Sequence, residues 1–436
     1  MSGPKVVRIV TREELIGICQ GQLARVDAAI ADWIRIGRKN AVIDDADIAA
    51  TRARRDALAA LIAADRFADL QKQAPVEAAF LRDDLQRRLE QAAKREAQAK
   101  ARQRREREAA QALLNRLRNA GAPLAPELEN GLRNADPAAV SQALLLLTAR
   151  ETQSPDHRLA ARLRDDAPAQ SFQDWLKTQP ASPEDPAIER IETRIAEIAR
   201  TDTRVDTIDW HARLAETAEA PKARRDLILD ALEVETGRAL TAIRQRARAI
   251  SQLRLALAEA EAAGMDMAQD AIDADTLTTE QVEERTATIE AAITTHRAER
   301  ALAHRRAAVL QGLSGLGYEV TEGMSTAWAT EGRLVLRSTG RPDYGVELSG
   351  GERVQMRPVA FDANGTGPDP SRDRDAEQIW CSDVTSLDRT LEQLGDDLVI
   401  EQSIPVGTIP LKRIRLDTTA AASSADIPTL RERTLR

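Results

Sequence analysis

The chain has 436 residues, of which 30% are charged and only 3% are aromatic, and its formal net charge is −8. A compact core normally uses many aromatic side chains, because each of them buries a large apolar area. The abundant residues here are strong helix formers such as alanine, leucine and arginine, and this composition favours long helices and coiled coils. The negative net charge argues against a general attraction of the whole chain to nucleic acid.

The cysteines and the apolar runs limit the cellular setting. Cys19 and Cys381 lie at opposite ends of the sequence and belong to no pattern of paired cysteines, which predicts a reduced, cytoplasmic environment. The longest apolar run, Ala57–Ala64, is far too short to span a bilayer. We therefore expect no membrane span.

The N-terminal segment, residues 1–11, contains one short strand, Lys5–Val10. Thr11 and Glu14 then have the spacing of a capping box, which predicts that the first helix begins at this point. Apolar residues recur three or four positions apart after Glu14, as in an amphipathic helix.

Residues 12–180 form a predicted helical region. A proline suits the first turn of a helix and not its interior, so Pro75 predicts the start of a long helix over residues 75–120. Five prolines divide residues 123–179 into a cluster of short helices. The segment Pro180–Pro186 is the clearest linker or sharp turn in the chain.

The second half of the chain combines helices with a small mixed domain. Residues 187–313 carry heptad-like apolar stripes, which fit either a coiled-coil dimer or an antiparallel bundle within one chain. Residues 314–416 contain β-rich segments, Thr326–Thr330 among them, and the Gly350–Gly351 pair predicts a hairpin turn. Residues 417–436 are predicted to be a disordered tail. The predicted fold class is mainly α, with long coiled-coil or helical-bundle segments and a small C-terminal α+β domain.

The segment Leu348–Glu352 reads LSGGE and resembles the signature motif of ABC-type ATPases, a family that includes coiled-coil chromosome-organising proteins. These enzymes also need a phosphate-binding loop that ends in Gly-Lys-Ser/Thr. No lysine follows a glycine anywhere in this chain. We therefore expect that the protein neither binds nor hydrolyses ATP and that the two glycines form a simple turn.

Residues 87–118 are strongly basic, because eleven basic residues minus four acidic residues give a local net charge of +7. A basic helix can follow a phosphate backbone. No aromatic residues interleave to stack on bases, and glutamates four positions before lysines are typical of a solvated helix. We favour the solvated helix and keep nucleic-acid binding as the alternative. The predicted contacts would be Arg102, Arg104, Arg105 and Arg107.

A charged segment of the C-terminal domain, residues 372–383, offers two further candidate sites. Several carboxylates on one helix could hold the metal ion of a hydrolase, although Lys412 is the only lysine in this domain. The metal candidates are Asp373, Asp375, Glu377 and Asp383. The simpler interpretation is an exposed, ion-paired helix start, with Ile379 and Trp380 packing on the sheet and Ser382 or Asp383 as the cap of a following helix. Candidates for an interaction surface are Trp380, Asp383, Arg372 and Arg374. No cofactor is predicted, and the four histidines lack the spacing of metal ligands.

The N-terminal strand needs a partner. Its apolar residues would be unfavourable on a free edge, and its backbone groups must be hydrogen-bonded or solvated. These residues are Val6, Val7, Ile9 and Val10. We expect the strand to join the C-terminal sheet, for which Leu411–Leu416 is an edge candidate. The alternative is that it pairs with a partner protein by strand addition.

The leading hypothesis is a non-enzymatic assembly subunit of a larger cytoplasmic complex, with the helices as a strut and the α+β domain as a docking head. Its partners would be other proteins, or a second copy joined through the coiled coil. The alternatives are a nucleic-acid-binding protein that uses the basic helix and a metal-dependent hydrolase in the C-terminal domain. The layout alone is a weak basis for choosing among them, because fold does not determine function.

Overall fold

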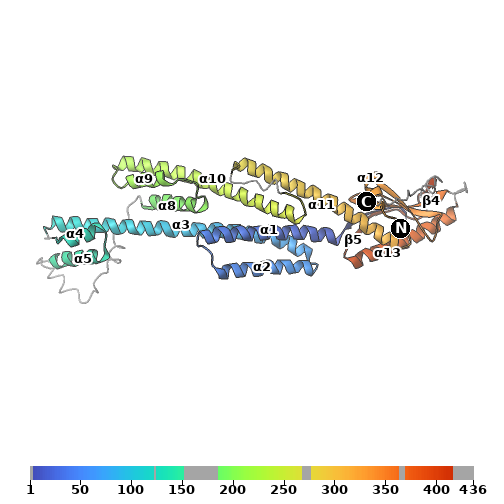
Figure 1. Cartoon of the computed structure of the whole chain (residues 1–436), viewed down its shortest axis with the longest axis horizontal. Helices are drawn as coiled ribbons and strands as arrows, with labels where there is room; N and C mark the ends of the chain where they lie inside the picture. The colour runs from blue at the N-terminus through green and yellow to red at the C-terminus, as the bar shows by residue number, and fades with distance from the viewer. Residues whose placement is uncertain (1–2, 122–123, 152–184, 268–275, 363–368, 416–436) are drawn as a thin grey trace, which may run out of the picture.

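The computed structural model describes residues 3–121, 124–151, 185–267, 276–362 and 369–415. They form a long helical stalk that ends in a small head (Figure 1). Most described residues are helical, and the sheet lies in the head, which confirms the predicted fold class. We use "stalk" for the helices outside the sheet domain and "head" for the sheet with the helices that cover it.

The first three helices lie along the length of the stalk. Helix α1 (Arg12–Lys39) leads away from the head, α2 (Asp45–Ala63) turns back, and α3 (Phe67–Asn119) runs out to the far end (Figure 1). Thr11 caps α1 by accepting a hydrogen bond from the backbone N–H of Glu14, as predicted. The start of α1 is therefore set by local sequence, since the oxygen of the capping side chain satisfies a backbone N–H that the helix itself leaves unpaired.

The predicted start of the long helix at Pro75 is wrong, because α3 begins at Phe67 and Pro75 lies inside it. A proline in a helix interior removes one hydrogen bond and costs about 3 kcal/mol. Phe67, Leu70 and Ala74 are buried against the first two helices. Burial of one large apolar side chain contributes roughly 1.5–3 kcal/mol, so the packing of this first segment outweighs the cost of the proline.

This explanation predicts that Pro75→Ala stabilises the protein, by about 1–3 kcal/mol, because alanine restores the missing hydrogen bond. The free energy of unfolding in urea is the measurement. Pro137→Ala is the matched control, since Pro137 is the first residue of its helix and removes no hydrogen bond there. Equal effects of the two substitutions would show that Pro75 carries no local cost.

The chain turns at the far end of the stalk and then returns. Helices α4 (Pro126–Arg133) and α5 (Pro137–Glu151) pack on the end of α3. The return is made by α8 (Asp185–Thr201), α9 (Ile208–Glu216), α10 (Lys222–Ala262) and α11 (Thr279–Gly315), and α11 enters the head (Figure 1). Of the two arrangements that the apolar stripes allow, this out-and-back course is the antiparallel bundle within one chain. Most of the predicted linker at Pro180–Pro186 lies outside the described residues, as do residues 152–179.

Buried carboxylates connect the outgoing and returning helices. The side chain of Glu197 on α8 is only 3% exposed and accepts a hydrogen bond from Arg244 on α10 at 2.7 Å. Glu259 on α10 is similarly buried and pairs with Arg25 of α1 and Arg297 of α11. A buried charge that loses its partner is strongly unfavourable. These pairs therefore fix the lengthwise register of the stalk helices.

The head contains a six-stranded sheet in the order β2-β3-β4-β1-β5, with β6 parallel to the second half of β4. Apart from that pair, neighbouring strands are antiparallel. The strands are β1 (Lys5–Val10), β2 (Arg333–Arg337), β3 (Tyr344–Gly350), β4 (Arg353–Asp362), β5 (Asp397–Ser403) and β6 (Lys412–Arg415). Gly350, at a φ of +88°, ends β3 at the hairpin turn into β4. The LSGGE segment is thus strand and turn, not the start of a helix.

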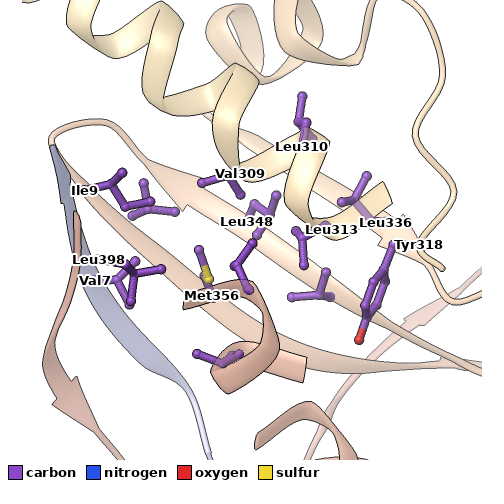
Figure 2. Packing of buried hydrophobic residues seen from close by; sticks show 14 of the residues in the cluster. Val7, Ile9, Val309, Leu310, Leu313, Tyr318, Leu336, Leu348, Met356 and Leu398 are labelled. Atoms are coloured by element: carbon purple, nitrogen blue, oxygen red, sulfur yellow. The ribbon is translucent and has the colours of Figure 1, made fainter. Parts of the chain in front are cut away.

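The N-terminal strand joins the C-terminal sheet, which confirms the predicted pairing within the chain. The predicted neighbour was wrong, however, because β1 lies between β4 and β5 and does not pair with Leu411–Leu416. β6 pairs with the second half of β4, and β1 pairs with the first half of the same β4 edge. Val7 and Ile9 are fully buried, and Figure 2 shows them in the core beside Leu398 and Met356.

Helices cover one face of the sheet. Val309, Leu310 and Leu313 at the end of α11 pack over Leu348 and Met356 (Figure 2). The same core contains residues of two more helices, α12 (Met324–Glu331) and α13 (Pro370–Leu394). The apolar end of α11 is therefore shared by stalk and head, and it connects the two rigidly.

Two predictions for the head are corrected. The segment Thr326–Thr330 is part of helix α12 and not a strand, because Trp328 points into the core and glycines bound the helix at both ends. Asp383 does not cap a second helix, since α13 continues through it. Buried residues three or four positions apart run unbroken along α13, so its packing on the sheet favours one continuous helix. They are Trp380, Val384, Leu387 and Leu391.

Candidate interaction surfaces

In the part of the chain that the structure describes, the outer strands of the head sheet are β2, β5 and β6. The outer edge of β2 is contacted at its end, where the backbone N–H of Glu319 donates a hydrogen bond to the carbonyl of Arg337 at 2.8 Å. The opposite edge is β5, whose known partner is β1 on its inner side. Val399 and Ile400 of β5 are 40% and 45% exposed.

The composition of β5 does not block strand addition. Proteins usually protect an edge with lysine, proline or a bulge, since free backbone N–H and C=O groups attract other strands. β5 reads DLVIEQS and has neither lysine nor proline, although its register with β1 shifts once, next to Val7. Glu401 forms ion pairs with Arg8 and Arg353 on the sheet face opposite the core helices. β5 is therefore the part of the head best suited to pair with another chain.

The sequence-predicted surface on α13 is only partly exposed. Trp380 is 2% exposed and packs edge-on against Tyr318 at a centroid distance of 6.2 Å, so it belongs to the core and not to a surface. Asp383 accepts a hydrogen bond from the Tyr318 hydroxyl at 2.8 Å. Burial, with this hydrogen bond, raises the pKa of Tyr318 well above its usual range. Arg372 and Arg374 alone remain exposed candidates.

Three of the four carboxylates considered for a metal site, Asp373, Glu377 and Asp383, accept hydrogen bonds from different partners. Asp373 accepts hydrogen bonds from Tyr344 and Arg413, both at 3.1 Å, while the buried Glu377 accepts one from the backbone N–H of Gly407 at 2.6 Å. Burial and the hydrogen bond to Asp373 raise the pKa of Tyr344 to about 12. Among the residues that the structure describes, no three histidine, cysteine or acidic side chains are grouped to hold a metal ion. The hydrolase hypothesis therefore has no geometric support there.

The basic helix does not present its arginines together. Arg104 is paired with Glu192 of α8 and is part of the interface between the two helices. Arg102, Arg105 and Arg107 are exposed on the middle of α3. Arg104 thus has a structural role, and nucleic-acid binding by the other three stays a prediction.

A surface that the sequence did not indicate lies in the stalk. A groove of about 770 Å³ runs between α1, α3 and α10, and the residues that follow α8 form its outer end. Ten basic and four acidic side chains line it. Its apolar lining includes Ala29, Trp33, Ala78, Leu85 and Ala247. These residues come from helices far apart in sequence, and each one fits an ordinary helix stripe, so no local pattern could have shown the groove.

The structure and the comparisons with known proteins add two findings. Across the described ranges, no helix combines the length and apolar character that crossing a bilayer requires. Comparison with known proteins gives no relative whose activity could be transferred to this chain. Its function therefore has to be inferred from its own geometry. No protein family, curated protein or solved structure matches this chain.

Proposed function

We propose that this protein is a non-enzymatic assembly subunit that uses its stalk as a strut and its head to dock a partner protein. The observation that carries the proposal is the uncovered β5 edge, with Val399 and Ile400 exposed, at one end of an elongated molecule (Figure 1). The proposed setting is cytoplasmic, which is supported by the two cysteines, neither of which is in a disulfide.

The contacts within the stalk support its role as a strut. The buried pairs of Glu197 with Arg244 and of Glu259 with Arg25 and Arg297 connect neighbouring stalk helices, and the pair with Arg25 joins two helices that run in opposite directions. Sliding of one helix along another would separate these charges in a desolvated interface, which is costly. The stalk is therefore suited to hold its two ends at a fixed distance.

The chemistry of β5 defines the partner segment. An added strand would gain main-chain hydrogen bonds along the edge and would be selected by side chains at alternate positions. Val399 and Ile400 favour apolar or β-branched residues opposite them. Asp397 favours a basic residue at one end of the segment, whereas Glu401 already pairs with Arg8 and Arg353. The proposed partner is thus a protein with a short extended segment that is apolar at its centre and basic at one flank.

Site-specific photocrosslinking tests this proposal. A photoreactive amino acid at position 400 should attach one partner protein in the native host, because that side chain borders the free edge. The matched control places the same group at Arg333, which is exposed on β2, the strand at the opposite edge of the sheet. A second variant, Ile400→Lys, should remove the same protein from the material that co-purifies with the chain, since lysine protects an edge.

Two results would contradict the docking role of β5. One is equal crosslinking from positions 400 and 333, which would indicate random contact. The other is unchanged co-purification of the crosslinked protein with the Ile400→Lys variant. In contrast, a partner that crosslinks at position 400 and is lost with that substitution would place the docking contact on β5.

A further inference from the structure

The N-terminal strand begins with a buried lysine. Lys5 is the first residue of β1 and is only 4% exposed. Because side chains alternate along a strand, it lies on the same side of β1 as the core residues Val7 and Ile9. A lysine is rarely buried unless an acidic group pairs with it. In the part of the chain that the structure describes, the side chain that accepts a hydrogen bond from its amine is instead a thiol, that of Cys381.

The contact between Lys5 and Cys381 joins the first strand to α13. The Nζ atom of Lys5 donates a hydrogen bond to the Sγ atom of Cys381 at 3.7 Å, although a thiol sulfur is only a weak acceptor. A hydroxyl oxygen is close by, because Ser403 of β5 lies directly opposite Lys5 in the sheet. The buried Oγ of Ser403 has no hydrogen-bond partner among the described residues. The amine is therefore directed at the sulfur and not at the hydroxyl.

The two cysteines of the chain differ in their access to solvent. Cys381 is half-buried, so a small oxidant can reach its sulfur. Cys19 is completely buried in the stalk and donates a hydrogen bond to the backbone carbonyl of Phe67 at 3.8 Å. Burial also raises the pKa of the Cys19 thiol, and the thiolate is the form that oxidants attack. Cys19 is thus an internal control for the reactivity of Cys381.

We propose that Lys5 and Cys381 form a covalent crosslink through one oxygen atom when the protein is exposed to hydrogen peroxide. In the first step, peroxide transfers an oxygen atom to Sγ as its O–O bond breaks, which gives a sulfenic acid and one water molecule. In the second step, a second peroxide oxidises the amine, so that an N–O bond forms, the sulfenic O–H and one N–H are lost, and two water molecules leave. Sulfur and nitrogen each lose two electrons, and each peroxide accepts two.

The bridge would connect two parts of the head that are far apart in the sequence. Lys5 and Cys381 are separated by 376 positions. A crosslink that closes a long loop stabilises a protein mainly by restricting its unfolded state. Because β1 lies between β4 and β5, the bridge would hold a central strand of the sheet on α13. This oxidised state of the head does not depend on the docking role proposed for β5.

Mass spectrometry of the full-length protein after treatment with hydrogen peroxide tests for the bridge. After proteolysis, the peptides that contain Lys5 and Cys381 should appear as one species, heavier than their sum by one oxygen atom less two hydrogen atoms. Dithiothreitol should separate them again, whereas sulfinic and sulfonic acids of cysteine would persist. The bridged protein should also unfold at a higher urea concentration than the reduced protein.

Substitutions assign the bridge to these two side chains. Cys381→Ser should abolish the crosslinked species, and so should Lys5→Arg, because the delocalised guanidinium keeps the charge but is a poor nucleophile. The matched controls are Cys19→Ala and Lys412→Arg, which change the other cysteine and the other lysine of the head and should leave the crosslink unchanged. Thermal unfolding shows whether each variant is folded. Lys5→Met is the second test if Lys5→Arg does not fold.

Three results would overturn the proposal. The first is folded, peroxide-treated protein in which Cys381 stays reduced or becomes sulfinic acid without any crosslinked peptide. The second is a crosslinked species of unchanged yield in folded Lys5→Arg or Lys5→Met protein. The third is attachment of Cys381 to other lysines as often as to Lys5, which would indicate random reaction in solution.

Discussion

Replacing Ile9 by alanine should destabilise the head by about 2–5 kcal/mol, the usual cost of truncating a buried isoleucine to alanine. Ile9 is fully buried, and its strand lies between β4 and β5. Hydrogen–deuterium exchange of the β3 and β4 amides in increasing urea reports on the head separately from the stalk. The expected result is faster exchange in both strands at every urea concentration.

Arg8→Ala is the control for this experiment, because Arg8 belongs to the same strand but points away from the core. Its ion pair with Glu401 is long, at 3.9 Å, and exposed, so its loss should cost less than about 1 kcal/mol. Deletion of residues 1–10 should abolish protection of the head. If the deletion leaves the exchange of β3 and β4 unchanged, β1 is not an integral strand of this sheet.

Local sequence predicted the start of the first helix and the pairing of the first strand. Thr11 satisfies a backbone donor three residues away, so its effect requires no knowledge of the fold. The strand Lys5–Val10 was predicted to pair because an apolar strand cannot remain alone. Its position between β4 and β5 could not be predicted, since it depends on which half of the β4 edge β6 leaves free.

Where local preference and tertiary packing disagree, the packing decides. Pro75 is a strong local signal for a helix start, yet the burial of Phe67 and Leu70 extends α3 across it. Thr326–Thr330 has β-branched residues, but the burial of Trp328 stabilises a short helix. In each case the decisive contacts are made by residues distant in sequence, so a single sequence does not contain a visible signal for them.

The candidate surfaces were harder to predict than the fold. Trp380 was a candidate for an interaction surface because it lies in a charged segment, but the structure bears out the simpler interpretation that it packs on the sheet, in line with Val384, Leu387 and Leu391. The exposed edge at β5 follows from the strand order, which periodicity does not reveal. Prediction of the groove would require the relative positions of three helices. No residue that lines it is unusual for a stalk helix.

Replacing Arg244 by methionine should destabilise the stalk by about 3–5 kcal/mol, because it leaves the carboxylate of Glu197 buried without its main partner. Only the amide of Gln86 would still donate a hydrogen bond to Glu197, at 2.7 Å. Hydrogen–deuterium exchange should show the loss of protection in α8 and α10, while the head strands keep theirs. The free energy of unfolding in urea gives the magnitude.

The double variant Arg244→Met with Glu197→Leu separates the lost charge pair from lost packing. Two apolar residues in a desolvated interface avoid the unpaired charge, so the double variant should recover most of the stability that Arg244→Met removes. Arg66→Met serves as the surface control, since its pair with Asp69 is exposed and should contribute less than about 1 kcal/mol. If the double variant is no more stable than Arg244→Met, unpaired charge is not the cause of the loss. The aliphatic contacts of Ile191 and Ile195 with α10 would then contribute more to the position of α8 than this ion pair does.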